Sequence, residues 1–202
     1  IFCGYSDISA LLNAIYTKTG LITYHGPNFN SFENITNYTI DSFLKCVAHN
    51  DEYRINPLNG DKFNIVNKGM TKGTVVGGNL STLNLLQGTE FMPALDNVIL
   101  FLEDINFVGK YFLGEFERKL QSLLQVKNCK INGLMLGKFN NDFALNNDCI
   151  ARIINGKKQL KDIPVVSNIT IGHLPSFATF PIGGTAEICT ENSAACLQIK
   201  EH

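Results

Sequence analysis

The sequence predicts an α/β fold, and three observations lead to this class. Apolar, β-branched segments alternate along the chain with segments whose apolar residues recur every three to four positions, as strands alternating with helices do. The apolar run at residues 98–102 is uninterrupted, which is typical of a strand buried on both faces of a parallel sheet. Residues 181–189 and 195–199 are predicted to pair as a hairpin turned around residues 191–194, so the chain ends in strands.

The first 49 residues are predicted to contain two helices. Residues 9–16 carry apolar side chains on one helical face, with Asp7 or Ser9 available as the N-cap and Gly20 as the residue that ends the helix. The other elements expected here are a strand at 21–24, a loop at 26–37 and a short helix at 39–47.

Residues 50–73 carry proline and glycine among polar side chains and are predicted to link two domains, residues 1–49 and residues 74–202. The elements expected in the second domain, before its closing hairpin, are a strand at 74–76 leading into Gly77, Gly78 and Asn79, a helix at 80–86, a strand at 98–103, a helix at 115–124, a strand at 131–136, a helix at 149–154 and a strand at 164–169.

The composition excludes several classes of partner. Only 17% of the residues are charged and the formal net charge is −1, so neither nucleic acid nor an anionic membrane is a predicted partner. The apolar runs are far shorter than a membrane span. The six cysteines form no CxxC pair and are predicted to be free thiols in a reducing compartment, which favours a cytoplasmic location. The four histidines show no paired ligand spacing, so neither a metal nor another cofactor is predicted.

The turn at Gly4-Tyr5-Ser6-Asp7 is the first candidate for chemistry. It lies between a short apolar run and the first predicted helix, in the strand–turn–helix order of a nucleophile elbow. Such a turn presents the Ser6 hydroxyl over a helix N-terminus, where unpaired N–H groups and the helix dipole stabilise an oxyanion. Glycine and serine are also common in ordinary turns, so a plain turn is the alternative.

Two further residues complete a possible triad. Glu103 ends the buried strand at 98–103, and the carboxyl ends of parallel strands are where open α/β sheets place functional groups. His173 follows the last predicted parallel strand in a loop that contains glycine and proline. A solvated acidic residue and a structural histidine are the alternatives. A serine needs a base, and the base needs a carboxylate to fix its tautomer, so these residues together predict a serine nucleophile.

Segments spread over nearly the whole chain match one known family in order. They are GYSDISAL at 4–11, YHGP at 24–27, GGNLSTL at 77–83, LFLED at 100–104, and the segment from Gly172-His173 to the glycine pair at 183–184. On these motifs the chain resembles the serine carboxypeptidase family that contains the bacterial LD-carboxypeptidases (murein tetrapeptide carboxypeptidases) and the microcin C immunity proteins.

The resemblance implies a role for each matched residue. It implies Ser6 as nucleophile, Glu103 as the orienting acid and His173 as general base. It also implies an oxyanion hole that includes the Asp7 backbone N–H, and substrate contacts near Gly78 and Asn79. Asn79 is equally well placed to cap the following helix. The matched His25 and Pro27 are interpreted as structural residues or as part of the pocket wall, and a homodimer is expected.

The resemblance further implies that residues 1–49 are the end of a flavodoxin- or Rossmann-like N-terminal domain, followed by a swivelling β/α C-terminal domain. Family members carry a further portion before the Gly-x-Ser-Asp turn, with a glycine-rich loop that completes the oxyanion hole. For the 202 residues alone we therefore expect a folded C-terminal unit and a mobile first segment of about 40 residues, which limited proteolysis would trim first.

Two substrates and one non-enzymatic function are compatible with the sequence. The substrates are the L,D-peptide bond of a murein tetrapeptide, and the amide between an aspartyl residue and a nucleotide-like group. The segment at 28–63 and the segment at 180–185 resemble the microcin immunity proteins more closely, with Phe29, Phe32 and Phe63 as candidate stacking platforms in a chain without tryptophan. The alternative function is a truncated binding module of the same family.

Overall fold

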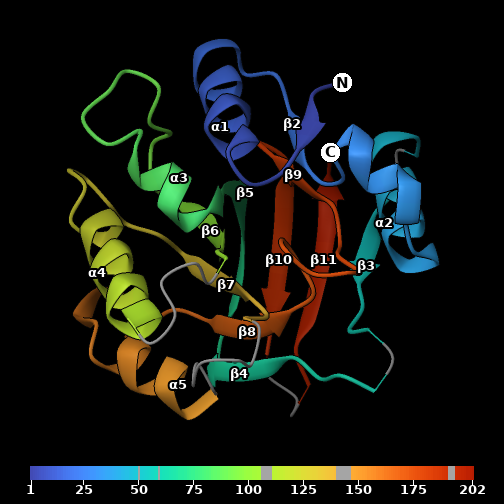
Figure 1. Cartoon of the computed structure of the whole chain (residues 1–202). Coiled ribbons are helices and arrows are strands. Elements are labelled where there is room, and N and C mark those ends of the chain that lie inside the picture. Colours follow the sequence, from blue (N-terminus) through green and yellow to red (C-terminus); the bar gives the residue numbers. More distant parts are fainter. Residues whose placement is uncertain (50, 59, 106–110, 140–146, 191–193) are drawn as a thin grey trace.

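The computed structural model of the chain has the predicted α/β architecture, with two β-sheets and helices packed on them (Figure 1). It describes residues 1–202 except for residues 50, 59, 106–110, 140–146 and 191–193. Part of the predicted hairpin turn at 191–194 falls outside the described residues.

The larger sheet has eight strands in the order β3-β11-β10-β5-β6-β7-β8-β4. Its strands are β3 (Tyr53–Ile55), β4 (Asn64–Asn67), β5 (Met70–Asn79), β6 (Val98–Glu103), β7 (Gly133–Gly137), β8 (Val165–Ile169), β10 (Thr185–Cys189) and β11 (Cys196–Glu201). The four central strands β5, β6, β7 and β8 are parallel, so their carboxyl ends lie at the same edge. The outer strands pair antiparallel.

The smaller sheet joins the two ends of the chain. It consists of β1 (Cys3–Gly4), β2 (Thr23–His25) and β9 (Phe180–Ile182), in that order. β1 and β2 are parallel and connected through α1 (Ile8–Thr19), while β9 pairs antiparallel with β2. A strand from the C-terminal part of the chain therefore holds the strand that leads into Ser6.

The parallel strands of the large sheet are apolar on both faces. Along β6, Leu100 and Leu102 belong to one core cluster, while Ile99 and Phe101 belong to the other. The first cluster also takes in the buried faces of α3 (Leu80–Asn84), α4 (Phe112–Leu124) and α5 (Asn147–Asn155), which cover one side of the sheet (Figure 1). Burial on both sides explains why β6 is an uninterrupted apolar run in the sequence.

The first helix begins and ends at residues that the sequence predicts, and the second begins at a capping residue that was not predicted. α1 ends at Gly20, which adopts a left-handed backbone conformation with φ 71° and donates its N–H to the Tyr16 carbonyl. Asp7 occupies the N-cap position of α1 without a side-chain capping bond. α2 (Asn37–Val47) is capped by Thr36, whose hydroxyl accepts a hydrogen bond from the Thr39 backbone N–H.

The structure corrects three expectations. The segment expected as a linker, residues 50–73, contributes β3, β4 and the start of β5 to the large sheet. The loop expected at 26–37 contains the 3₁₀ helix η1 (Phe29–Asn34), and the strand expected at 181–189 is divided into β9 and β10, which belong to different sheets. β3, β4 and β9 are only three or four residues long, so pairing with partners distant in sequence decides them, not local propensity. The domain boundaries themselves stay a prediction.

The first segment is packed against the rest of the chain, which does not support the expectation that it is mobile. Leu12 of α1 is only 1% exposed and belongs to the second core cluster. The Asn13 side chain is fully buried; its amide donates to the Gly77 carbonyl at 2.7 Å and its oxygen accepts from the Gly77 N–H at 3.2 Å. Buried contacts of this kind protect a segment from local opening.

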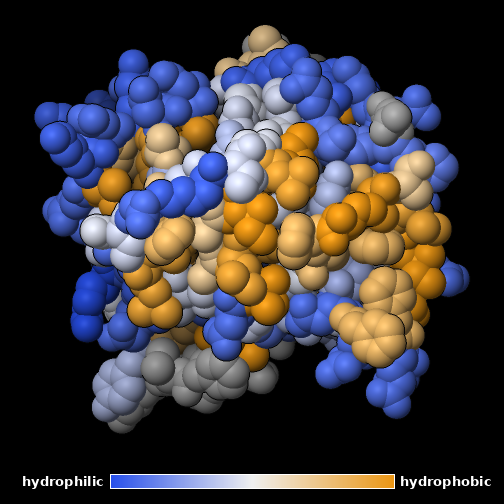
Figure 2. All heavy atoms as spheres, turned by 90° about the horizontal axis from the view of Figure 1, so that it is seen from above, coloured by the Kyte–Doolittle hydropathy of each residue, from blue (hydrophilic) through white to orange (hydrophobic). Residues whose placement is uncertain are grey.

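Apolar side chains also reach the surface at the end of the molecule that carries α1 and the N-terminus. Figure 2 shows this end from above, with adjoining orange groups between polar ones. Large apolar residues of the first segment that are exposed include Ile1, Phe2, Leu11, Leu21 and Phe29. β1 is an outer strand of the small sheet and pairs on one side, with β2. Among the described residues, no helix is long and apolar enough to cross a membrane.

The packing of α1 predicts that alanine substitutions at Leu11 and Leu12 have very different effects on the free energy of unfolding. Leu12→Ala should lower the free energy of unfolding by about 2–5 kcal/mol, because it leaves a cavity in the core. Leu11→Ala is the matched control: its side chain is 57% exposed, so the change should be within about 0.5 kcal/mol. Chemical denaturation measures both. Equal effects of the two substitutions would contradict the packing of α1 described here.

Candidate active site

Ser6 lies at the tip of a tight turn between β1 and α1. Its φ is 61°, a left-handed conformation that is uncommon for a residue with a side chain and that is characteristic of strained functional turns. A Cβ at Gly4 would lie 2.7 Å from Asn28 Oδ1 and from Ile8 Cγ2, so only glycine fits at the start of the turn. The sequence prediction of a strand–turn–helix elbow at Ser6 therefore describes the local geometry correctly.

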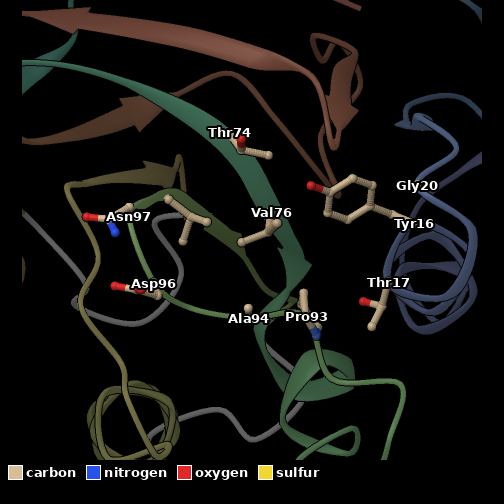
Figure 3. A pocket seen from close by; sticks show the side chains of 10 residues that line it. Tyr16, Thr17, Gly20, Thr74, Val76, Pro93, Ala94, Asp96 and Asn97 are labelled. Carbon is tan, nitrogen blue, oxygen red and sulfur yellow. The ribbon is translucent and has the colours of Figure 1, made fainter.

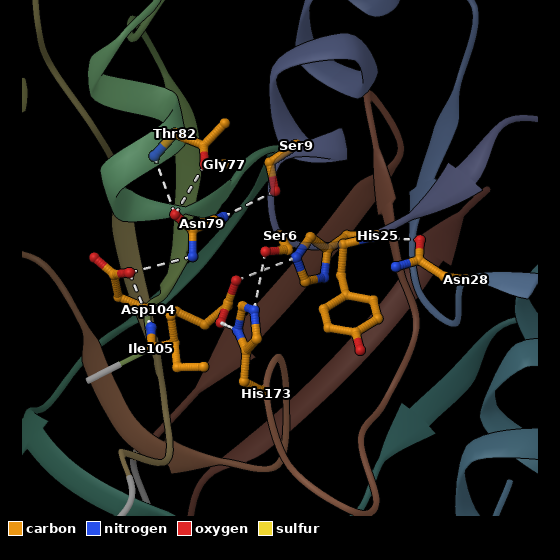
Figure 4. A network of polar contacts seen from close by, with 12 residues as sticks. Ser6, Ser9, His25, Asn28, Gly77, Asn79, Thr82, Asp104, Ile105 and His173 are labelled. Atoms are coloured by element: carbon orange, nitrogen blue, oxygen red, sulfur yellow. Dashed lines mark hydrogen bonds and ion pairs between the residues drawn. The ribbon is translucent and has the colours of Figure 1, made fainter. Parts of the chain in front are cut away.

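His173 joins the serine to a buried carboxylate. Its Nε2 lies 3.0 Å from Ser6 Oγ, and its Nδ1 lies 2.8 Å from Glu103 Oε2 (Figure 4). These distances are within hydrogen-bonding range. The three residues come from positions 6, 103 and 173, and the structure brings their side chains together in the geometry of a serine–histidine–carboxylate triad.

The position of Glu103 is fixed by the large sheet. It is the last residue of β6, its side chain is 2% exposed, and the loop after β8 places His173 beside it. Gly172 allows this close approach: its φ is 83°, and a Cβ there would lie 2.2 Å from Glu103 Oε2. The glycine before His173 is therefore a requirement of the site.

A second histidine faces the other oxygen of the same carboxylate. His25, at the end of β2, is fully buried, and its Nε2 lies 3.6 Å from Glu103 Oε1. This distance is longer than a hydrogen bond. Neither ring nitrogen of His25 nor Glu103 Oε1 has a hydrogen-bond partner among the described residues. The His25 ring also packs edge-on against Phe101, with ring centroids 4.9 Å apart.

From the sequence, His25 is interpreted as a structural residue or as pocket wall, with no connection to Glu103. The available signal was its place in the matched YHGP segment, directly after a predicted strand. Tyr5 was likewise not singled out. Its ring packs edge-on against both histidines, with centroid distances of 5.1 Å to His173 and 6.5 Å to His25.

The surroundings of His173 and Glu103 shift the pKa values of the two residues in opposite directions. Burial alone would raise the pKa of Glu103, but its hydrogen bond to His173 and the proximity of His25 lower it to about 2. Burial would lower the pKa of His173, but the hydrogen bond and charge of Glu103, with smaller contributions from Asp104 and Asp7, raise it above its ordinary value. A permanently ionised carboxylate therefore stabilises the protonated imidazole.

This arrangement is suited to proton transfer from serine. His173 Nδ1 faces an acceptor, Glu103, which leaves Nε2 free to accept the Ser6 proton. The Asp7 backbone N–H donates to no acceptor among the described residues, and it lies at the N-terminus of α1. An unpaired N–H at a helix N-terminus stabilises negative charge.

Gly78 and Asn79, expected as substrate contacts, lie at the carboxyl end of β5. A Cβ at Gly78 would lie 2.7 Å from Ser9 Oγ and 3.1 Å from His25 Cδ2, so this glycine permits the close packing of β5 on α1 and β2. The Asn79 side chain is already engaged: its oxygen caps α3 by accepting from the Thr82 N–H at 3.0 Å.

The Asn79 amide nitrogen is also engaged, because it donates to Asp104 Oδ1 at 3.2 Å (Figure 4). Asp104 further accepts from the Ser81 hydroxyl and from the Ile105 N–H. The structure therefore gives Asn79 the capping role that the sequence analysis left open, and its contact with a substrate stays a prediction.

Two cavities lie at different distances from Ser6, Glu103 and His173 along the chain, and none of these three residues lines either cavity. The smaller cavity, of about 170 Å³, is lined by Tyr5, which packs against His173, and by Leu174, Pro175 and Phe177 from the loop that carries His173. The larger one, of about 570 Å³, lies between Tyr16 and Thr17 of α1 and Asp96 and Asn97 before β6 (Figure 3). Among the described residues, no group of three or more His, Cys, Asp or Glu side chains could hold a metal ion.

Comparison with known families and proteins gives consistent results. A model of the LD-carboxypeptidase C-terminal domain matches residues 72–188, and a model of the LD-carboxypeptidase N-terminal domain matches residues 1–26. YocD of Bacillus subtilis (strain 168), which is provisionally named a carboxypeptidase, is 38% identical over 223 residues, covering 100% of this chain and 68% of YocD.

Two solved structures extend this similarity. An MccF-like protein from Bacillus anthracis str. Ames has a TM-score of 0.95 and 39% identity, over 100% of this chain and 68% of that one. The microcin C7 self-immunity protein MccF, known from Escherichia coli, was solved in complex with aspartyl sulfamoyl adenosine; its TM-score is 0.78 at 27% identity, again over 100% of this chain and 68% of MccF. The chain thus spans about two thirds of the length of these proteins.

The hydrogen bond between His173 and Glu103 predicts that the pKa of His173 depends on the charge of Glu103. In Glu103→Gln, the pKa of His173 should fall, because the charge that raises it is removed while the burial that lowers it stays. NMR titration of the His173 imidazole measures this. Glu115→Gln is the control, because Glu115 pairs with Arg118 on α4 and is no partner of His173. An unchanged His173 pKa in a folded Glu103→Gln protein would refute the coupling.

Proposed function

The chain belongs to the LD-carboxypeptidase family, and from this premise we propose that it is a serine hydrolase that cleaves an amide next to a free carboxylate through an acyl-enzyme. The observation that supports the proposal best is the continuous hydrogen-bonded series from Ser6 through His173 to Glu103. The relatives are longer than this chain of 202 residues, so the activity is proposed for the whole protein that contains it.

In the proposed reaction Ser6 Oγ attacks the scissile carbonyl while His173 accepts its proton. Glu103 holds the resulting imidazolium in place and stabilises its charge. The Asp7 N–H and the N-terminus of α1 stabilise the oxyanion of the tetrahedral intermediate. His173 then donates its proton to the leaving amine, and a water molecule, activated by the same histidine, releases the acyl group from Ser6. Only neutral His173 accepts the serine proton.

For the substrate, we propose the microcin-like class, an acidic aminoacyl group joined to a nucleoside-like moiety. The high similarity to an MccF-like protein supports this choice, and MccF itself was solved with aspartyl sulfamoyl adenosine. The L,D-peptide bond of a murein tetrapeptide is the second candidate, supported by the LD-carboxypeptidase domains that match the chain.

Of the three phenylalanines proposed for stacking, Phe29 fits a role in nucleobase binding best. Its side chain is 92% exposed on η1, the helix that also contributes to the smaller cavity. Phe32 is held edge-on against Phe43, with centroids 5.5 Å apart, and Phe63 packs on the second core cluster. A homodimeric state, a cytoplasmic location and the alternative of a non-catalytic binding module stay open to experiment.

Loss of the nucleophile tests the catalytic proposal. Ser6→Ala should reduce kcat on the order of 10⁶-fold and abolish labelling by a serine-directed fluorophosphonate, and His173→Ala should have a similar effect. Glu103→Gln should reduce kcat on the order of 10⁴-fold. Ser122→Ala is the control, because Ser122 on α4 bonds Gln87 and lies outside the triad. A folded protein that is not labelled at Ser6 would favour the binding module.

The stacking role of Phe29 gives a separate test of the substrate class. Phe29→Ala should raise KM for aspartyl sulfamoyl adenosine by roughly 5- to 100-fold, the cost of one lost base–aromatic stack, and leave kcat nearly unchanged. Phe91→Ala is the control, since Phe91 is an exposed phenylalanine that contacts Lys18 instead. Turnover of murein tetrapeptide but not of the nucleoside substrate would establish the second candidate.

A further inference from the structure

Two of the six cysteines lie directly opposite each other in the large sheet. β10 and β11 are antiparallel neighbours, and their register pairs Cys189 with Cys196. Both are free thiols in this structure. The pair lies at the end of the hairpin next to its turn, and it is independent of the triad and of the function proposed for it.

Both thiols lie on the accessible face of the hairpin. Side chains alternate along the two strands, and the buried positions on one face are Ala186 and Ile188 of β10 and Leu197 and Ile199 of β11. Cys189 and Cys196 occupy the opposite face and are half-buried, as are Glu187 and Gln198. Two side chains on the same face of directly paired residues point the same way, so Cys189 and Cys196 are a cross-strand side-chain pair.

The backbone separation suits a disulfide. Directly opposed residues of an antiparallel pair have Cα atoms about 4.5–5.5 Å apart. Disulfides require a Cα separation of roughly 4.4–6.8 Å. The separation expected from this register therefore falls within the range that a disulfide requires.

The remaining cysteines have no comparable arrangement among the paired strands described. Cys46 is buried and Cys3 is half-buried, and burial raises the pKa of each of these two thiols to about 12, which suppresses the reactive thiolate. Burial also raises the pKa of Cys129. The accessible, directly paired thiols are those of Cys189 and Cys196.

We propose that Cys189 and Cys196 form a reversible redox site, which closes to an intramolecular disulfide when it meets an oxidised low-molecular-weight thiol such as glutathione disulfide. The thiolate of one cysteine attacks the small disulfide RSSR, forms a protein–S–SR mixed disulfide and releases RS⁻. The second thiolate attacks the protein sulfur of this mixed disulfide, closes the Cys189–Cys196 bond and releases the second RS⁻. Two protein thiols are oxidised, and one RSSR is reduced to two RSH.

The disulfide would cross-link β10 and β11 next to their turn. β10 also pairs with β5, so the hairpin is a continuous part of the large sheet. A cross-link between residues 189 and 196 restricts the unfolded chain more than the folded one, and the oxidised protein should therefore melt at a higher temperature than the reduced protein.

The cleavage sites in the sequence allow the Cys189–Cys196 disulfide to be detected by peptide mapping. No lysine or arginine occurs between Lys161 and Lys200, so one tryptic peptide, residues 162–200, holds both cysteines and no other. Cleavage after glutamate cuts the chain at Glu191, between the two cysteines, and the resulting peptides stay joined only if the disulfide has formed.

The experiment equilibrates the protein in glutathione buffers of increasing oxidation, then alkylates free thiols and maps peptides without reduction. We expect the wild-type peptide 162–200 to lose both alkylation sites, the two fragments on either side of Glu191 to remain linked, and added dithiothreitol to restore both thiols. Oxidation should raise Tm in the wild type and in the control Cys129→Ser, but not in Cys189→Ser or Cys196→Ser.

Three results would overturn the proposal. They are full alkylation of both cysteines after oxidation, glutathione adducts on one or both without a linked pair, and linkage of either cysteine to a different cysteine or to a second chain. Peptide mapping of the wild type decides between them even if a serine variant fails to fold.

Discussion

The contact between the buried Glu103 carboxylate and His173 is the interaction on which the candidate active site depends. A carboxylate that is 2% exposed requires a compensating partner, since an unpaired buried charge is strongly destabilising. His173 supplies this partner at 2.8 Å, and His25 faces the remaining oxygen at 3.6 Å. The same contact that satisfies the carboxylate orients the imidazole toward Ser6, so stability and catalytic geometry share one interaction.

The glycines around this contact show how tightly it is built. Gly172 lets the His173 loop approach Glu103, and Gly78 lets β5 approach His25 and α1. Gly77, with φ 134°, would place a Cβ 1.9 Å from the Phe101 carbonyl oxygen. Each of these residues stands where a side chain would separate two strands or displace a loop. Glycine at these three positions is therefore explained by close packing against backbone or side-chain atoms.

The small sheet explains how residues at the two ends of the chain meet. β9 pairs with β2, and β2 pairs with β1, the strand that leads into Ser6. The loop between β8 and β9 carries His173 and connects the large sheet to the small one. The first segment is thus held by a strand that lies more than a hundred residues later, and its buried α1 contacts reinforce this attachment.

The amino-acid sequence by itself determined the α/β class, the uninterrupted strand that ends at Glu103, the turn at Ser6 and the choice of His173, because these depend on local patterns of apolar residues, glycines and motif order. Only the tertiary structure decided that residues 53–55 and 64–67 are strands, that the segment after His173 is divided between two sheets, and that His25 faces Glu103. It also decided that Cys189 and Cys196 are directly opposed, because the register of two strands depends on the hydrogen-bonded partners of each. For the first three, the physical reason is that pairing and burial are contacts between residues far apart in the chain, and short or polar segments carry too little local preference to reveal them. For the two cysteines, which are close in the chain, a hairpin can be predicted from the sequence, but its register depends on the hydrogen bonds that the strands form.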